Sequence, residues 1–241
     1  MTLSIVIPAF NEEAYLGPTL DSLRVAAAVL EARAGAAVET IVVDNNSRDR
    51  TASVARRRGA TVVHEPVQLI ARARNAGARR ASGNVLVFLD ADVIVPPEFL
   101  IRIHEAMSDP ACVGGGVETA WRAERFSVRL HLWAWWLLVR LTGMVTGAAQ
   151  FARREAFDQV GGYDERAWIG EDVDLVWRLG KLGRRTGRRI RRIREPPVRP
   201  STRRFDKWPL WKILIWTNPL FLAVFRRWKT PWSGWYSRAV R

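Results

Sequence analysis

Short β-branched runs alternate with longer, Ala- and Leu-rich stretches in the first part of the chain. The runs are typical of strands and the stretches between them are typical of helices. Strands are expected at residues 3–8, 38–43, 61–63 and 85–89, and helices at about 12–33, 51–58 and 69–81. This order predicts an α/β fold with a mainly parallel, doubly wound sheet that has helices on both faces.

Polar residues follow three of these strands. They are Ala9-Phe10-Asn11-Glu12, Asp44-Asn45-Asn46-Ser47 and Asp90-Ala91-Asp92. Each segment taken alone is typical of a turn or a helix cap. Three such segments after strands of one parallel sheet favour a ligand site, because the connecting loops meet at the carboxyl ends of the strands.

The segment Asp90-Ala91-Asp92 is the main candidate for phosphate chemistry. The sequence has no G-x-x-x-x-G-K-[ST] loop, and no G-x-G-x-x-G follows the first strand. Two carboxylates after a buried strand can hold Mg²⁺ or Mn²⁺, whose open positions take diphosphate oxygens. A simple turn is the alternative interpretation.

Composition narrows the classes of protein that fit. The chain has 241 residues, of which 48% are apolar and 26% charged, enough for one large domain or two small ones. One cysteine, Cys112, and three histidines argue against a disulfide framework and a Cys/His zinc site. The first residues lack the pattern of a secretory signal, so we expect a cytoplasmic protein.

Six motifs along the chain resemble, in the same order, those of family 2 glycosyltransferases with the GT-A fold. The motifs are residues 4–12, 42–47 with Asp49 and Thr51, 73–77, 88–92, 153–157 with 161–165, and 171–175. The resemblance covers about residues 3–183. It implies a metal-dependent, inverting transferase that moves a sugar from a UDP- or GDP-sugar to a hydroxyl or phosphate acceptor, lipid-linked acceptors included.

The resemblance also assigns roles to residues of the donor site. Asp44 is expected to accept a hydrogen bond from the base, and Arg74 to face the base and the diphosphate. Asp90 is expected near the ribose and Asp92 on the metal. The residues expected to bind the nucleotide-sugar are Pro8, Phe10, Glu12, Asp44, Asn46, Arg74, Asp90 and Ala91. The alternative for Arg74 is an exposed helix arginine.

The acidic segment Glu171-Asp172-Val173-Asp174 is expected to begin a helix, where acidic residues can simply complement the helix dipole. By resemblance, Asp172 is the general base. Such a base takes the proton of the acceptor hydroxyl as that hydroxyl attacks the anomeric carbon. The candidate acceptor-binding residues are Tyr163, Glu171, Trp136, Arg203 and Arg204.

The net charge of +14 is concentrated in the last part of the chain. Residues 176–241 carry 19 Lys and Arg but only 2 Asp and Glu. Such a block predicts an anionic partner, whether a membrane surface, a phosphorylated substrate or a nucleic acid, with a solvated basic face as the alternative. We therefore expect a catalytic domain at 1–183, with a nucleotide-binding part at about 1–95 and an acceptor part at about 96–183, followed by a basic extension at 184–241.

An apolar, aromatic segment lies within this extension at residues 205–229. Pro209, Lys212 and Pro219 interrupt it, so it does not match a bilayer-spanning helix. Its flanking Trp, Lys and Arg residues favour an amphipathic segment in an anionic membrane interface, on the inner face of the cell membrane, over a packed core helix or a short insertion. A second apolar stretch, Leu130–Leu141, predicts an amphipathic helix over the acceptor site, with core packing as the alternative.

Two other functions match parts of the sequence. A nucleic-acid-binding protein would use the basic extension. However, the aromatic residues there cluster with long aliphatic residues instead of lying singly among the arginines. A membrane-recruited pseudoenzyme scaffold would keep the fold without the reaction, and the presence of Asp92 and Asp172 argues against it. The sequence therefore favours a glycosyltransferase and argues against a nucleic-acid partner.

Overall fold

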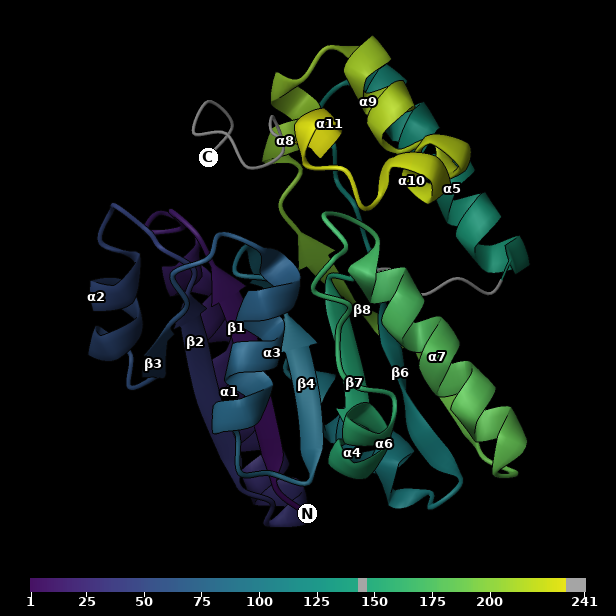
Figure 1. Ribbon diagram of the computed structural model, residues 1–241. Helices are drawn as coiled ribbons and strands as arrows, with labels where there is room; N and C mark the ends of the chain where they lie inside the picture. The colour runs from purple at the N-terminus through teal and green to yellow at the C-terminus, as the bar shows by residue number, and fades with distance from the viewer. Residues whose placement is uncertain (143–146, 233–241) are drawn as a thin grey trace.

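The computed structural model describes residues 1–142 and 147–232. An eight-stranded sheet with helices on its faces fills the lower part of Figure 1, and a group of helices lies above its upper edge. The strands are β1 (Leu3–Ala9), β2 (Val38–Asp44), β3 (Thr61–His64), β4 (Val85–Leu89), β5 (Val93–Ile94), β6 (Cys112–Thr119), β7 (Ala149–Arg153) and β8 (Arg189–Pro200). The helices are α1 (Leu16–Ala34), α2 (Thr51–Arg57), α3 (Ile70–Arg80), α4 (Phe99–Ser108), α5 (Phe126–Thr142), α6 (Arg154–Gln159), α7 (Glu171–Arg185), α8 (Arg203–Lys207), α9 (Leu210–Trp216), α10 (Pro219–Phe225) and α11 (Lys229–Trp232).

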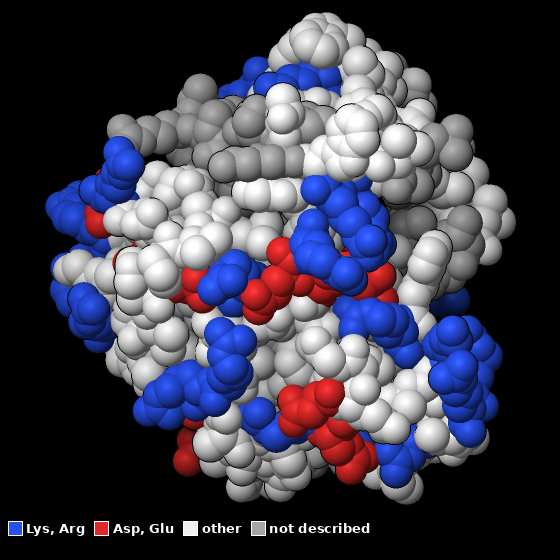
Figure 2. All heavy atoms as spheres, in the orientation of Figure 1, with Lys and Arg blue, Asp and Glu red and all other residues white. Residues whose placement is uncertain are grey.

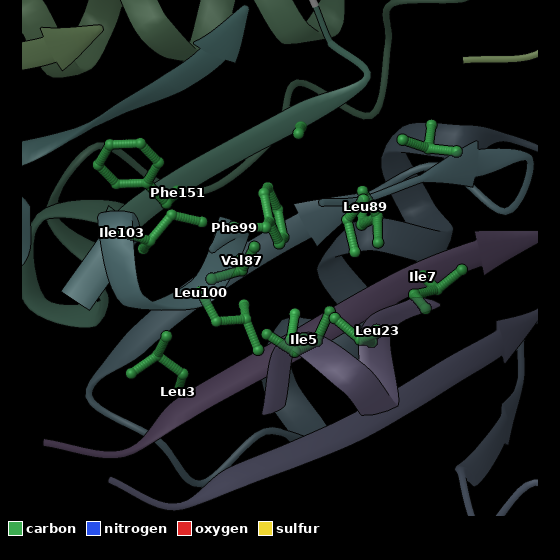
Figure 3. Packing of buried hydrophobic residues seen from close by; sticks show 14 of the residues in the cluster. Leu3, Ile5, Ile7, Leu23, Val87, Leu89, Phe99, Leu100, Ile103 and Phe151 are labelled. Atoms are coloured by element: carbon green, nitrogen blue, oxygen red, sulfur yellow. The ribbon is translucent and has the colours of Figure 1, made fainter. Parts of the chain in front are cut away.

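Strands β3, β2, β1 and β4 lie side by side in this order and are all parallel. Alternate side chains of β1 point to opposite faces of the sheet. Leu3, Ile5 and Ile7 pack with residues of α1 and α4 on one face, as Figure 3 shows. Val6 packs with residues of α3 on the other. The predicted doubly wound arrangement is therefore confirmed for this part of the chain.

The remaining strands make the sheet mixed. β7 runs antiparallel between β4 and β6, and β8 pairs parallel with β6 and antiparallel with β5. β8 contains much of the basic run that the sequence places in an extension beginning at residue 184, so the sheet continues past that boundary to Pro200. Its arginines mask a strand pattern in which Ile190, Ile193 and Val198 pack against the core.

The apolar segment at residues 205–229 folds into several short helices. Helices α8 to α11 lie with α5 above the sheet in Figure 1, and we call this group, α5 with α8 to α11, the helical cap. Trp208 and Ile213 are buried in a small core of the cap, so the alternative interpretation, a packed core helix, is correct for these two residues. Trp211 and Ile215 of the same segment are exposed. Among the residues that the structure describes, no helix is both long and apolar enough to cross a membrane.

Candidate active site

Hydrogen bonds tie together the loops that follow β1 and β2. The Asn11 N–H donates to Ser47 Oγ at 3.0 Å, and Asn11 Oδ1 accepts from the Arg48 N–H at 2.8 Å. The Glu12 N–H donates to Thr51 Oγ1 at 2.8 Å. The parallel pairing of β1 with β2 brings both loops to one edge of the sheet, and these bonds fix their relative position.

A cavity of about 80 Å³ lies at this edge, and we call it the small cavity. Its lining residues are Pro8, Ala9, Phe10, Glu12, Asn45, Ile70, Asp90, Ala91, Asp92 and Arg204. Most of the residues that the sequence assigns to the donor and the metal therefore meet in one place.

Three residues predicted for the donor site, Asp44, Asn46 and Arg74, lie outside this lining. The Asp44 carboxylate accepts a hydrogen bond from the Ser47 N–H at 2.9 Å, and Asn46 is exposed with a φ of 67°. The residue between them, Asn45, is buried and does line the cavity. The motif alone does not indicate which asparagine faces inward, because that depends on the left-handed backbone at Asn46.

Arg203, predicted as an acceptor residue, lies instead against the carboxylates of the small cavity. Its Nη2 is 2.5 Å from Glu12 Oε1 and 3.2 Å from Asp92 Oδ2, and its Cζ is 4.0 Å from the centroid of the Tyr15 ring. The pairing of β5 with β8 explains this placement, because the Ser201 N–H donates to the Asp92 carbonyl oxygen at 3.1 Å. A contact between residues so far apart in the chain has no local signal in the sequence.

A second cavity of about 340 Å³, the large cavity, lies between the edge of the sheet and the helical cap. Asp90, Glu171 and Asp172 line it on the sheet side. Its apolar lining residues include Trp121, Leu132, Trp135, Trp136, Val139, Trp168, Phe205, Trp216 and Leu222. Figure 2 shows acidic side chains in a band across the middle of this face of the molecule, with Lys and Arg side chains among them. Asp90 and Arg204 line both cavities, so the two are adjacent.

Asp172 lies in the first turn of α7, facing the large cavity. Its Oδ1 accepts a hydrogen bond from the Val173 N–H at 2.8 Å. Its carbonyl oxygen accepts from Gln150 Nε2 at 3.0 Å, and Gln150 Oε1 in turn accepts from the Tyr163 hydroxyl at 3.0 Å. Burial raises the pKa of Asp172 above its ordinary value, even though the Arg74 guanidinium acts in the opposite direction.

Arg74 connects the acidic residues beside the large cavity. It is only 2% exposed, which excludes the exposed-helix alternative. Its Nη1 lies 2.7 Å from Glu171 Oε1, and its Nη2 lies 2.8 Å from Asp90 Oδ1. Burial raises the pKa of Glu171 to about 7 despite this ion pair. Through these two ion pairs, the guanidinium of Arg74 connects α3 with α7 and with the end of β4 at the edge of the sheet. Arg74 also lines the large cavity.

The other predicted acceptor residues divide into two groups. Glu171, Trp136 and Arg204 line the large cavity, and Trp136 Nε1 donates to Glu118 Oε1 at 2.8 Å. Tyr163 is buried outside it, with its ring against Phe88. The motifs did not indicate several aromatic lining residues, namely Trp121, Trp168, Phe205 and Trp216. Phe205 and Trp216 belong to the apolar segment at residues 205–229, which the sequence predicts to face a membrane, and the signal for Trp121 and Trp168 is the richness of the sequence in Trp, with 12 residues.

The small cavity fits a divalent cation that a substrate helps to bind. The Asp92 side chain is 20% exposed and presents a carboxylate there. Within the described part of the chain, no three His, Cys, Asp or Glu side chains form a group that could hold a metal alone. Mg²⁺ typically binds one or two carboxylates together with substrate phosphates and water. These residues are therefore compatible with a divalent ion that binds to Asp92 and takes its remaining ligands from a substrate diphosphate and water.

Comparison with known proteins identifies the family. The model of the family described as Glycosyl transferase family 2 matches residues 4–161, more than half of the chain. The chain belongs to this family. The resemblance carried by the sequence motifs is thereby confirmed.

Two curated relatives show how much of a family 2 protein this chain represents. It is 31% identical over 234 residues to validoxylamine A glucosyltransferase of Streptomyces hygroscopicus subsp. jinggangensis, with 75% of this chain and 52% of that protein covered. It is 36% identical over 137 residues to undecaprenyl-phosphate 4-deoxy-4-formamido-L-arabinose transferase of Pseudomonas aeruginosa, with 50% and 38% covered. The chain spans about half the length of the curated relatives it matches.

A solved structure with a similar fold is the mannosyltransferase PcManGT of Pyrobaculum calidifontis, in complex with GDP-Man and Mn²⁺. The TM-score is 0.66 at 22% sequence identity, and the match covers 88% of this chain and 59% of that chain. This similarity confirms the predicted fold class of this family 2 member.

Proposed function

We propose that the chain transfers a sugar from a nucleotide-diphosphate sugar to a hydroxyl or phosphate acceptor, with inversion at the anomeric carbon. One observation carries the proposal. Asp90 and Arg204 line both cavities, so a donor in the small cavity and an acceptor in the large cavity would meet beside Asp172. Membership of glycosyl transferase family 2 supports the same class of reaction.

The small cavity is the proposed donor site. The complex of PcManGT with GDP-Man and Mn²⁺ supports a UDP- or GDP-sugar as donor. Asp92 would hold Mg²⁺ or Mn²⁺, and such an ion stabilises the negative charge of a departing diphosphate. Asp44 and Asn46, on the loop after β2, would contact the base from beside the cavity. Arg203 keeps the Asp92 carboxylate oriented through their 3.2 Å ion pair.

Asp172 is the proposed general base. Its carboxylate would accept the proton of the acceptor hydroxyl as the hydroxyl oxygen attacks the anomeric carbon on the face opposite the leaving nucleotide. The raised pKa of Asp172 supports this role, because a stronger base takes up that proton more readily. An ionised phosphate oxygen that itself attacked the anomeric carbon would not need this proton transfer, so Asp172 favours attack by a hydroxyl, on a phosphorylated acceptor or an unphosphorylated one.

The large cavity is the proposed acceptor site. Its lining is mainly Trp, Phe, Leu and Val, so an acceptor with an apolar part would bury that part there. Arg192 and Arg204 also line it and would attract a phosphate group. The relative named undecaprenyl-phosphate 4-deoxy-4-formamido-L-arabinose transferase supports a lipid-linked acceptor. A peripheral location on the cytoplasmic face of the membrane belongs to the same proposal.

Donor turnover tests this proposal without knowledge of the acceptor. The purified chain is incubated with a panel of UDP- and GDP-sugars and Mn²⁺, and release of nucleotide diphosphate is measured. We expect at least one donor to be hydrolysed, the activity to vanish with EDTA, and Mn²⁺ or Mg²⁺ to restore it. Asp92→Asn should lose the metal-dependent part of donor binding. Full turnover in EDTA would contradict the role of the metal, and no binding of any nucleotide-sugar would contradict the proposed function.

A further inference from the structure

The outer side of α5 carries an exposed apolar stripe. Its residues are Phe126, Leu130, Trp133, Leu137 and Leu141, whose spacing of three or four places them along one side of the helix. Their exposed fractions run from 39% at Leu137 to 77% at Leu141. Isolated exposed apolar residues are common, but a continuous stripe of this length on a helix indicates an interaction surface.

The opposite side of α5 is apolar as well. Leu132, Trp135, Trp136 and Val139 line the large cavity. A helix that only roofed this cavity would present polar residues to water on its outer side. α5 instead has apolar residues on both sides, so packing against the cavity does not account for the outer stripe.

A neighbouring helix also carries exposed apolar residues. In Figure 1, α9 lies along α5, and α10 contacts α9. On α9, Trp211, Leu214 and Ile215 are exposed by 63%, 49% and 43%. α9 packs on the side of α5 that bears Val128, His131 and Leu132, away from the stripe, so its exposed residues form a separate surface.

The charges on these helices have one sign. The sequences of α5, α9 and α10 contain no Asp or Glu, but they contain Arg129, Arg140 and Lys212. The Arg129 guanidinium lies over the Phe126 ring at 5.6 Å, beside the stripe. Exposed Trp, Leu and Phe together with Arg and Lys are typical of helices that lie in the headgroup region of a bilayer.

We propose that the α5 stripe docks onto a bilayer that contains anionic lipids. The apolar side chains enter the boundary between headgroups and acyl chains, and the basic residues contact lipid phosphates. Docking by α5 brings the large cavity, which the opposite side of α5 lines, within about one helix diameter of the lipid surface. Delivery of a lipid-linked acceptor from that surface to the cavity is the one consequence that rests on the proposed function.

Vesicle flotation tests the docking directly. The full chain is mixed with vesicles of phosphatidylcholine alone or of phosphatidylcholine with phosphatidylglycerol. We expect it to float with the anionic vesicles, and less of it to float at high salt because surface charges are then screened. The double variant Leu130→Ser with Trp133→Ser should reduce the floated fraction about tenfold, since both changes remove apolar burial.

A matched control separates this surface from general hydrophobicity. Trp177 is 67% exposed on α7, outside the stripe, so Trp177→Ser should float like the unchanged chain. Circular dichroism checks that each variant is folded. Failure of the full chain to float, or equal flotation of the stripe variant, would overturn the proposal. Dimerisation that the stripe variant abolishes would show that a second copy covers the stripe. Flotation needs no turnover, so its outcome is independent of the donor panel.

Discussion

Gly147 lies so close to Asp172 that only a glycine fits there. A Cβ at this position would lie 2.8 Å from Asp172 Cγ, closer than carbon atoms approach without displacement. We predict that Gly147→Ala pushes the carboxylate aside, lowers turnover by at least about tenfold, and leaves donor binding nearly unchanged, because small misplacements of a reacting group are costly. Steady-state kinetics and calorimetric titration of the donor measure the two effects.

Gly180, on the same helix as Asp172, provides a matched control. A Cβ there would meet its nearest neighbour, Arg184 Nη1, at 3.7 Å, an ordinary contact. Gly180→Ala should therefore keep full turnover and raise the free energy of unfolding by about 0.5–1 kcal/mol, since alanine favours the helix. Equal losses in both variants would show that Gly147 has no special relation to the base.

The pH dependence of turnover follows from the raised pKa of Asp172. The base works only when ionised, so turnover should rise with pH as its proton is lost. Because burial raises that pKa, the acid limb of the profile should lie above the range of an ordinary aspartate, about 3.9. Glu171→Gln removes a neighbouring negative charge and leaves Arg74 freer to stabilise the Asp172 carboxylate, which should move the limb to lower pH. A limb that stays in place would contradict the coupling.

At the scale of elements, the sequence predicts the parallel half of the fold well. β4 begins and ends where the apolar run at residues 85–89 does, and the helix before it, α3, lies close to the expected residues 69–81. The convergence of Glu12, Asp90 and Asp92 is also predictable, because parallel strands bring their loops together. The walls of the large cavity are not predictable in this way, because they depend on the long-range packing of α5 against α9. The contact of Arg203 with Asp92 is not predictable either, because it depends on the β5–β8 pairing.

Arg226, which follows α10, connects the helical cap to α7 and to the loop before it. Its Nη2 lies 3.2 Å from Asp174 Oδ1, and its carbonyl oxygen accepts from the Trp168 N–H at 2.7 Å. We predict that Arg226→Gln lowers the free energy of local opening of α9 and α10 by about 1 kcal/mol, the upper range for a partly exposed ion pair. Amide hydrogen exchange in these two helices should then become about fivefold faster.

Arg227→Gln is the matched control for Arg226→Gln. Arg227 is 50% exposed and meets one carboxylate, Asp164 Oδ2 at 3.1 Å. Its loss should change exchange in α10 much less. Equal exchange in both variants would show that the cap is held by its apolar contacts alone.

For the whole molecule, the structure changes the interpretation of the basic run that begins at residue 184, which the sequence alone places in an extension. Arg189 and Arg191 both pair with Asp109, and Arg188 pairs with Glu155. These arginines therefore take part in holding β8 at the edge of the sheet. The net charge of +14 still favours anionic ligands, but the part of the run from Arg189 onward belongs to strand β8 of the sheet. Composition alone does not distinguish these situations, because a strand with arginines on its exposed side resembles a basic tail.

The central claim is that Asp172 acts on a donor bound in the neighbouring cavity, and one substitution tests it most directly. Asp172→Asn keeps the size of the side chain but cannot take up the proton. Calorimetric titration with nucleotide-sugar and Mn²⁺ is compared with turnover for this variant and the unchanged chain. We predict nearly equal donor binding and a loss in turnover of about 10²–10⁴, the usual contribution of a general base. Turnover at the normal rate with donor binding intact would contradict the claim and transfer the role of base to another carboxylate of the large cavity.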